Sequence, residues 1–229
     1  MAAITDMTVR DVKLKEFMDE YHRPLREDLY ELRLSNEEAG VPLILRETEA
    51  ALSLLLDFTH PQNILELGTA HGYSALFFAA KCPDAAVTTI DRNPGMIDFA
   101  KASFERFKEG NRIRFITADA LETLEKLEAE VDSGADRYDF IFIDAGKSHY
   151  REFLDVCERI CTDDAVIVCD NILMKGWLFD YEGKSAKRHR TNIKYMKQFL
   201  DYINGRDDLD VTILSGGDGL AVIRPNHDR

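Results

Sequence analysis

The chain has 229 residues, of which 45% are hydrophobic and 31% charged, and its formal net charge is −13. This composition is typical of a water-soluble globular protein, and the length fits one large domain with a sizeable core. The negative charge argues against nonspecific binding of nucleic acid over the whole surface, although it leaves room for a local basic patch. We predict a single domain over residues 1–229, in which residues 1–60 form a helical lead-in.

Export and membrane signals are missing from the sequence. No apolar run is long enough to span a membrane, and residues 1–11 lack the apolar core of an export signal. The 4 cysteines include no C-x-x-C pair, which argues against a zinc or redox motif. Cys157 and Cys161 are expected to share one face of a helix. We expect reduced, mostly buried thiols in a cytoplasmic protein.

The lead-in carries helical patterns. Apolar residues recur at roughly helical spacing over residues 8–34, which predicts one or two amphipathic helices broken near Pro24. Residues 35–40 are expected to form a turn or a short cap. A further helix is predicted over residues 43–58.

From residue 63 onward, short apolar runs alternate with helical segments. The runs predict strands at 63–67, 86–91, 113–117, 138–144, 165–170, 210–214 and 220–224. This alternation implies a parallel, doubly wound sheet. The last two strands are separated only by residues 215–219, which is too short for a crossover helix, so they should form an antiparallel hairpin. The predicted fold is α/β, with a Rossmann-like doubly wound sheet of seven mostly parallel strands, an antiparallel terminal hairpin strand and N-terminal helices.

The segment NILELGTAHGYS, residues 63–74, is typical of a strand, a tight glycine turn and a helix start. Gly68 and Gly72 let a ligand approach the backbone, where free N–H groups point at it. The glycine spacing differs from the G-x-G-x-x-G of dinucleotide sites, and Glu66 would repel a diphosphate. An acid beside such a turn suits a ligand with a positive amino group, such as S-adenosylmethionine.

A second acid supports this interpretation. Asp91 ends the next apolar run, about 20 residues further on, where an acidic side chain holds a ribose in doubly wound folds. The alternative is a plain strand, turn and helix with structural glycines.

The motif Glu66–Ser74 resembles the first motif of the class I S-adenosylmethionine methyltransferases. It most resembles that of the cation-dependent O-methyltransferases, such as the catechol and caffeoyl-coenzyme A enzymes, and the resemblance runs from about Val41 to Pro225. It implies an S-adenosyl-L-methionine site made by Ile44, Glu66, Gly68, Thr69, Ala70, Gly72, Ser74, Asp91, Arg92, Asp119, Ala120 and Asp144. Without the resemblance, Asp119 would be interpreted as the cap of the helix that follows it.

Oxygen-bearing side chains follow two apolar runs at the points where the strands should end. Asp144 follows residues 140–143, and Asp170 and Asn171 follow residues 166–169. Such ligands suit Mg²⁺ or Mn²⁺ better than zinc or copper. The resemblance implies that these three residues bind a divalent metal, whereas capping of the next turn is the alternative.

Lys147 follows Asp144 by three residues. The resemblance implies that a lysine at this spacing acts as general base on the substrate hydroxyl, so Lys147 and Asp144 are the predicted catalytic residues. A nearby cation makes a lysine lose its proton more easily, and a metal lowers the pKa of a hydroxyl. An exposed surface lysine, or one that only orients the hydroxyl, remains an alternative. The predicted reaction is direct displacement at the sulfonium methyl, without a covalent enzyme intermediate.

A group of cations, here called the basic cluster, follows the predicted metal ligands: Lys175, Lys184, Lys187, Arg188, Arg190, Lys194 and Lys197. Phosphate contact with RNA would explain it, and a solvated helix face is the alternative. The sequence from Asp170 through this cluster to the Gly-Asp-Gly-Leu hairpin resembles a bacterial subgroup that methylates 5-hydroxyuridine at the wobble position of tRNA. This implies tRNA as partner, bound through Lys184, Lys187, Arg188 and Arg190.

Other functions remain open at this point. A small catechol-type or caffeoyl-coenzyme A-like phenol could be the acceptor, because a coenzyme A tail also carries phosphates. Catechol enzymes use an additional acid against the second hydroxyl, and no clear counterpart occurs here. A protein that binds S-adenosylmethionine without catalysis is disfavoured by the complete set of predicted metal ligands and Lys147. The resemblance also implies a homodimer, with the N-terminal helices as candidate interface.

Overall fold

The computed structural model describes residue 13, residues 16–179 and residues 187–226. Seven strands form one sheet in the order β3-β2-β1-β4-β5-β7-β6. Their bounds are β1 Asn63–Leu67, β2 Ala86–Asp91, β3 Ile113–Thr117, β4 Tyr138–Ile143, β5 Cys161–Cys169, β6 Leu209–Leu214 and β7 Leu220–Pro225. Pairing is parallel from β3 to β5, whereas β7 is antiparallel to both β5 and β6. The predicted sheet and its terminal hairpin are confirmed.

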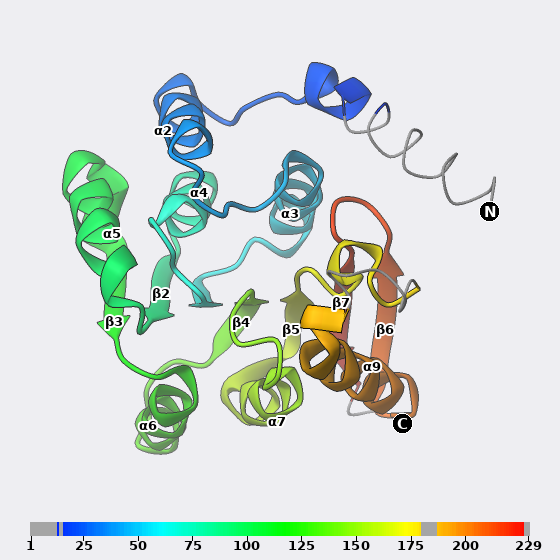
Figure 1. Ribbon diagram of the computed structural model, residues 1–229. Coiled ribbons are helices and arrows are strands. Elements are labelled where there is room, and N and C mark those ends of the chain that lie inside the picture. The colour runs from blue at the N-terminus through cyan, green and yellow to red at the C-terminus, as the bar shows by residue number, and fades with distance from the viewer. Residues whose placement is uncertain (1–12, 14–15, 180–186, 227–229) are drawn as a thin grey trace.

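Helices cover both faces of the sheet. Their bounds are α2 Glu27–Glu38, α3 Arg46–Thr59, α4 Tyr73–Lys81, α5 Pro94–Arg106, α6 Ala120–Asp132, α7 Tyr150–Ile160 and α9 Arg190–Asn204, with short 3-10 turns η1 Lys108–Arg112 and η2 Met174–Gly176. The helices α2 to α4 lie on one side of the sheet, and α6, α7 and α9 lie on the other (Figure 1). Among the described helices, none has the length and apolar composition needed to cross a membrane.

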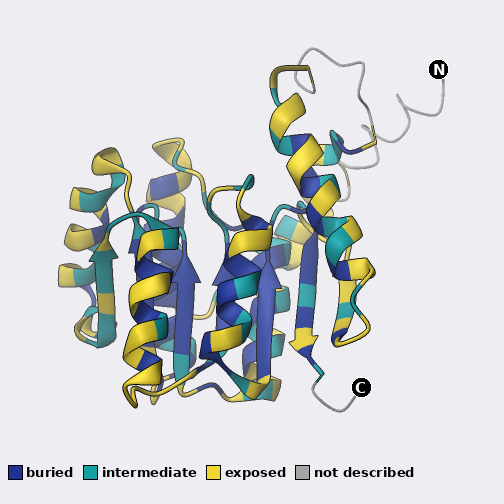
Figure 2. Cartoon of the chain, turned by 90° about the horizontal axis from the view of Figure 1, so that it is seen from below, coloured by how far each residue is buried: buried dark blue, intermediate teal, exposed yellow. Residues whose placement is uncertain are grey.

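The central strands are buried on both faces, as Figure 2 shows. Side chains alternate between the two faces of a strand, so each face packs into its own core. In β1, Ile64 belongs to the core under α2 to α4, whereas Leu65 and Leu67 belong to the core under α6, α7 and α9. This burial explains why the strands are continuous apolar runs in the sequence.

Three predicted boundaries were wrong by three or four residues, whereas several others differ by one residue. The helix α2 continues to Glu38, through residues expected to form a turn, because buried Asn36 bonds to His71 across the core. The helix α3 begins only at Arg46. The strand β5 begins at Cys161, which pairs with Tyr138.

The early start of β5 also corrects a prediction about the cysteines. Cys157 lies in α7 and Cys161 in β5, so the two do not share a helix face. The four cysteines are free and buried, as expected. Burial raises the pKa of the Cys161 thiol to about 11, so this thiol is held in its unreactive protonated form.

Candidate active site

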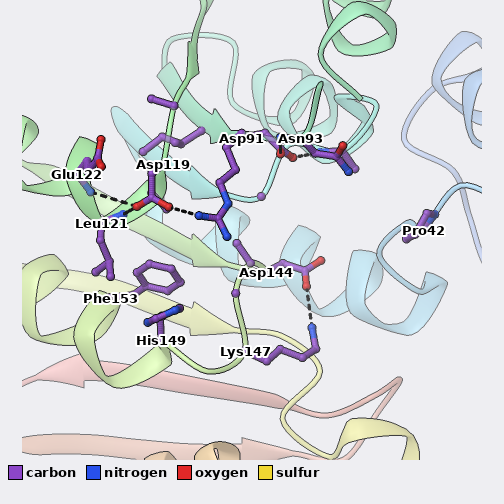
Figure 3. Close-up of a pocket in the computed structure, with 18 of the residues that line it drawn as sticks. Pro42, Asp91, Asn93, Asp119, Leu121, Glu122, Asp144, Lys147, His149 and Phe153 are labelled. Atoms are coloured by element: carbon purple, nitrogen blue, oxygen red, sulfur yellow. Dashed lines mark hydrogen bonds and ion pairs between the residues drawn. The ribbon is translucent and has the colours of Figure 1, made fainter. Parts of the chain in front are cut away.

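A cavity of about 820 Å³ lies at the carboxyl ends of the parallel strands. It takes one or more residues from the end of each of five strands, among them Gly68, Asp91, Asp119, Asp144 and Asn171. The strand order reverses between β1 and β4, which is where ligands bind in doubly wound sheets. The volume is in the range of small-molecule and cofactor sites. Figure 3 shows the side chains that line it.

The glycine turn after β1 requires glycine at two positions. Gly68 has φ +106°, and a Cβ there would lie 2.5 Å from the carbonyl oxygen of Asp144. Gly72 has φ +82°, and a Cβ there would lie 2.6 Å from the ring of Phe104. Both distances are too short for any side chain, so the two glycines allow the turn to fit between its neighbours.

Asp91 holds this turn in place. Its Oδ2 accepts hydrogen bonds from the backbone N–H groups of Thr69 (3.1 Å) and Ala70 (2.9 Å), and its Oδ1 accepts one from the N–H of Asn93 (2.8 Å). Oδ1 accepts only this one bond and keeps a second lone pair, so Asp91 can still accept from a ligand in the cavity that it lines.

Arg92 and Asp119 form an ion pair in the cavity wall, with Arg92 Nη1 lying 2.5 Å from Asp119 Oδ2. The other carboxylate oxygen of Asp119 accepts a hydrogen bond from the N–H of Leu121 at 2.9 Å, so Asp119 caps α6 as predicted. Ala120, the first residue of α6, also lines the cavity. The ends of β2 and β3 are thereby joined on one side of the site (Figure 3).

The structure corrects the position expected for Glu66. Its side chain is wholly buried and lies outside the cavity wall, on the same face of β1 as Ile64. Thr89 Oγ1 donates a hydrogen bond to its Oε2 instead, and its Oε1 has no hydrogen-bond partner within the described structure. Glu66 therefore supports the turn from beneath and is not in contact with the cavity. Burial, its largest influence, raises the pKa of this carboxyl to about 7.

Other predicted cofactor residues divide into two groups. Gly68 and Ala70 line the cavity, whereas Thr69, Gly72 and Ser74 are buried beneath them. Ile44 is buried in the core, and the preceding residues Pro42 and Leu43 line the cavity in its place.

His149 and Phe153 line the cavity but were missed in the sequence. They lie four residues apart where α7 begins, with ring centroids 6.0 Å apart. Residues four apart share a helix face, so their spacing shortly after Lys147 was a usable signal. Figure 3 shows both rings on the Leu121 side of Lys147.

The predicted metal ligands come together as expected from the sheet topology. Lys147 Nζ donates to Asn171 Oδ1 at 2.6 Å and lies 3.5 Å from Asp144 Oδ1. Asp170 is wholly buried; its Oδ1 accepts from the N–H of Asn171 at 2.6 Å, and its Oδ2 has no hydrogen-bond partner within the described structure. A buried carboxylate oxygen without a partner fits a metal site. So does a group of oxygens that already holds a cation, here the Lys147 ammonium.

Negative charge is concentrated at this point. Burial, and then the Asp144 carboxylate, raise the pKa of Asp170; burial likewise raises the pKa of Asp144. Asp218, at the tip of the β6–β7 hairpin, adds a third charge that the sequence analysis did not place here. No group of three or more His, Cys, Asp or Glu side chains is arranged as a metal site within residues 16–179 and 187–226, so any site here depends on the amide of Asn171.

Among the described residues of the basic cluster, Lys175 lies in η2, Lys187 and Arg188 directly precede α9, and Arg190, Lys194 and Lys197 lie in α9. Lys187, Arg188 and Arg190 are exposed, and none of them forms an ion pair in the described part of the chain. Lys184 lies outside the described residues. Lys187, Arg188 and Arg190 are therefore exposed to an anionic partner.

The sequence matches the model of the O-methyltransferase family over residues 18–226. The chain belongs to this family. It is 29% identical to a catechol O-methyltransferase of Niastella koreensis over 197 residues, which are 82% of this chain and 86% of the relative. It is 26% identical to a caffeoyl-CoA O-methyltransferase of Stellaria longipes, over 86% of this chain and 83% of the relative.

Solved structures give the same result for the fold. A Staphylococcus aureus protein, provisionally described as a caffeoyl-CoA O-methyltransferase, has a TM-score of 0.82 and 28% identity, over 93% of this chain and 99% of that chain. An O-methyltransferase from Bacillus cereus in complex with SAH has a TM-score of 0.78 and 24% identity, over 93% and 97% of the two chains. This O-methyltransferase therefore has the fold of known members of its family, and it is an enzyme.

Glu66 gives the O-methyltransferase a pH-dependent stability. The folded protein holds the Glu66 proton up to a pKa of about 7, compared with 4.5 for an unperturbed glutamate, so the folded state binds more protons between these values. The free energy of unfolding should fall as pH rises through this window, by about 3 kcal/mol in total. Glu66→Gln should remove this fall. Urea unfolding of the wild type and of Glu66→Gln at pH 5 and pH 8 measures this fall. An equal fall in both proteins would contradict the argument that burial raises the pKa of Glu66.

Proposed function

We propose that this O-methyltransferase moves the methyl group of S-adenosyl-L-methionine to an acceptor hydroxyl with the help of Mg²⁺ or Mn²⁺. The observation that carries the proposal is that one cavity joins the glycine turn to Asp144 and Asn171, and that the buried carboxyl of Asp170 directly precedes Asn171 at the end of β5. Lys147 lies within this set.

The cofactor would lie along the turn. We propose that Gly68 and Ala70 face it, that Asp91 accepts from its ribose, and that Asp119 and Ala120 contact its adenine. All five residues line the cavity. The Bacillus cereus structure contains SAH, the demethylated form of this cofactor.

Asp144, Asp170 and Asn171 would hold the metal, which lowers the pKa of an acceptor hydroxyl and offsets the charge on its oxygen. We propose that Lys147, as neutral amine, takes the hydroxyl proton. The acceptor oxygen then forms a bond to the methyl carbon as the carbon–sulfur bond breaks, and S-adenosylhomocysteine leaves. Lys147 releases its proton to solvent. The turn and the strand ends align the two reactants.

We propose 5-hydroxyuridine in the wobble position of tRNA as acceptor, giving 5-methoxyuridine. The exposed side chains of Lys187, Arg188 and Arg190, which form no ion pair within the described residues, support a polyanionic partner. A 5-hydroxyuridine also presents a hydroxyl next to a carbonyl oxygen, and two adjacent oxygens suit a site with an oxygen-bound metal.

A small catechol-type or caffeoyl-CoA-like phenol is the second candidate. The names of the two relatives support it. The rings of His149 and Phe153 in the cavity wall would suit an aromatic acceptor. The expected homodimer stays a prediction. The candidate interface consists of exposed apolar side chains of the helical residues 16–21 and of α3, namely Phe17, Tyr21, Leu54 and Phe58.

One experiment separates the two acceptors. Purified protein is incubated with labelled S-adenosylmethionine and Mg²⁺, with tRNA containing 5-hydroxyuridine in one arm and a panel of catechols and caffeoyl-CoA in the other. We expect transfer to tRNA that EDTA abolishes. Transfer to the phenols alone would replace the tRNA proposal, and transfer insensitive to EDTA would overturn the metal proposal.

Removing the charges of Lys187, Arg188 and Arg190 together, by substitution with alanine, should weaken tRNA binding. We expect KM for tRNA to rise about tenfold or more, and the slope of log KM against log salt to fall by about 2, because three phosphate contacts no longer release counterions. Steady-state kinetics at several salt concentrations measure both quantities.

The matched control removes three exposed lysines on α5, η1 and α6, namely Lys101, Lys108 and Lys126. This control should leave KM within about twofold of the wild-type value, because α5 and α6 lie at the β3 end of the sheet, whereas α9 lies at the β6 end (Figure 1). Equal effects of both triple variants would mean that tRNA responds only to net charge, and would contradict a specific role of the basic cluster.

A further inference from the structure

Two aromatic rings stack where the η2 segment meets α9. The ring centroids of Trp177 and His189 are 4.4 Å apart, and the ring planes differ by 10°. Trp177 is partly buried and packs on the core under α9, so it is fixed from beneath. His189 is the N-cap residue of α9, and its side chain makes no cap hydrogen bond. The described hydrogen bonds therefore give the ring nitrogens of His189 no structural role.

A second stacked histidine in the same protein differs in this respect. His71 lies 4.4 Å from the Phe99 ring with planes 16° apart, but it is buried and its Nδ1 is bonded to Asn36 Oδ1 at 3.0 Å. His71 is thus a core group tied to α2. His189 is only partly buried and has no such bond, so its stack is the one that a ligand can reach.

The stack is close to the metal-site residues. Trp177 follows Asn171 by six residues, which span at most about 20 Å when extended. The segment folds back through the bonds from Gly176 N–H to the Leu173 carbonyl and from Trp177 N–H to the Met174 carbonyl, both 3.0 Å. The true separation is therefore shorter, and one or two nucleotides can bridge it. Figure 1 shows the η2 segment in yellow beside the start of α9 in orange.

Exposed cations flank the stack. Arg188 and Arg190 are the chain neighbours of His189, and both are exposed and unpaired within the described residues. Phe179, two residues after Trp177, is 70% exposed. Aromatic rings interleaved with cations are typical of surfaces that bind single-stranded nucleic acid, where bases stack on the rings and cations contact phosphates.

We propose that the Trp177–His189 stack binds a nucleobase next to the methylated uridine, with Arg188 and Arg190 on the phosphates beside that base. The inference rests on the tRNA acceptor proposed above, and it assigns this surface to RNA. The base would stack on His189, which the rigid Trp177 supports from behind. An anticodon loop supplies such unpaired bases, whereas a small phenol has none.

The test uses the protein's single tryptophan. Because Trp177 is alone, its fluorescence reports this stack without a label. We titrate an anticodon stem-loop RNA into the wild-type protein and expect saturable quenching. His189→Ala should weaken RNA affinity about fivefold or more, since it removes the stacking partner of the base. His189→Phe, which keeps a flat ring, should restore affinity to within about threefold of wild type, and the exposed control His60→Asn should leave it unchanged.

Kinetics on the same RNA separate this inference from the proposed function. His189→Ala should raise KM for the stem-loop with little change in kcat, and it should leave Kd for S-adenosylmethionine unchanged. If the wild type methylates the RNA but shows no quenching, and His189→Ala does not raise KM, the proposed role of the stack is overturned. The proposed tRNA acceptor is then retained. No methylation of the RNA by wild type would overturn the acceptor itself, and quenching by coenzyme A but not by RNA would overturn the assignment to RNA.

Discussion

Replacing Asp170 by alanine is expected to reduce kcat for methyl transfer by about 10²–10³-fold or more, because the site loses a charged metal ligand. The side chain is wholly buried at the end of β5, and its unpartnered Oδ2 has no other function in the described structure. It lies outside the residues that line the cavity, so Kd for S-adenosylmethionine should change little. Single-turnover kinetics and calorimetric titration with the cofactor measure the two quantities.

Two further variants make this result specific. Asp170→Asn keeps the shape and an acceptor for the Asn171 N–H, so it should be as inactive as the alanine variant. Its free energy of unfolding should equal or exceed that of wild type, because a buried carboxylate is costly without its metal. Asp164→Ala, at an exposed position on the same strand, should stay fully active. An active Asp170→Asn, or loss of cofactor binding in either variant, would contradict the metal assignment.

Much of the sheet was predictable because its strands are buried on both faces. The run Phe140–Ile143 is apolar throughout because it packs between two helix layers, and in β1 only the buried Glu66 interrupts the apolar residues. The end of α2 was not predictable in this way. Asn36 favours a turn locally, but its side chain is buried against His71, 35 residues away, and this contact outweighs the local preference.

In the candidate site, too, some positions follow from the sheet topology and others depend on contacts between distant segments. Asp91, Asp144 and Asp170 could be located because parallel strands all deliver their carboxyl ends to one edge. The orientation of Glu66 could have been inferred from strand alternation, since Ile64 two residues earlier faces the α4 layer. The position of Asp218 could not be inferred from the sequence. Asp218 reaches the site only because the β6–β7 hairpin packs against the segment after β5, where the Leu173 N–H donates to the Asp218 carbonyl at 2.9 Å.

A buried ionic network joins the lead-in to the cofactor turn. Arg33 of α2 is 1% exposed and donates to Glu49 Oε2 of α3 at 2.5 Å. Tyr73, which follows Gly72 of the glycine turn, donates to the same oxygen at 2.7 Å. Arg33 also donates to the carbonyl oxygen of Ile44 at 3.0 Å, beside the residues that line the cavity. One guanidinium thus holds three segments that meet at the cofactor side of the site.

Arg33→Ala is therefore expected to lower the free energy of unfolding by about 3–5 kcal/mol, because it leaves the Glu49 carboxylate buried without its main partner. Urea unfolding measures this loss. The matched control is Arg106→Ala, which removes an exposed ion pair with Glu31 at 3.7 Å and should cost less than about 1 kcal/mol. Losses of similar size in both variants would contradict a structural role for the network.

The same substitution should also raise Kd for S-adenosylmethionine, because the Ile44 carbonyl and the Tyr73 hydroxyl lose a shared donor. The double variant Arg33→Met, Glu49→Gln separates the two effects. Removing both charges should recover most of the stability, since a buried ion pair adds little over a well-packed neutral pair. Cofactor affinity should stay low, because nothing then holds the Ile44 carbonyl. Recovery of both quantities together would mean that Arg33 stabilises the fold without positioning the cofactor site.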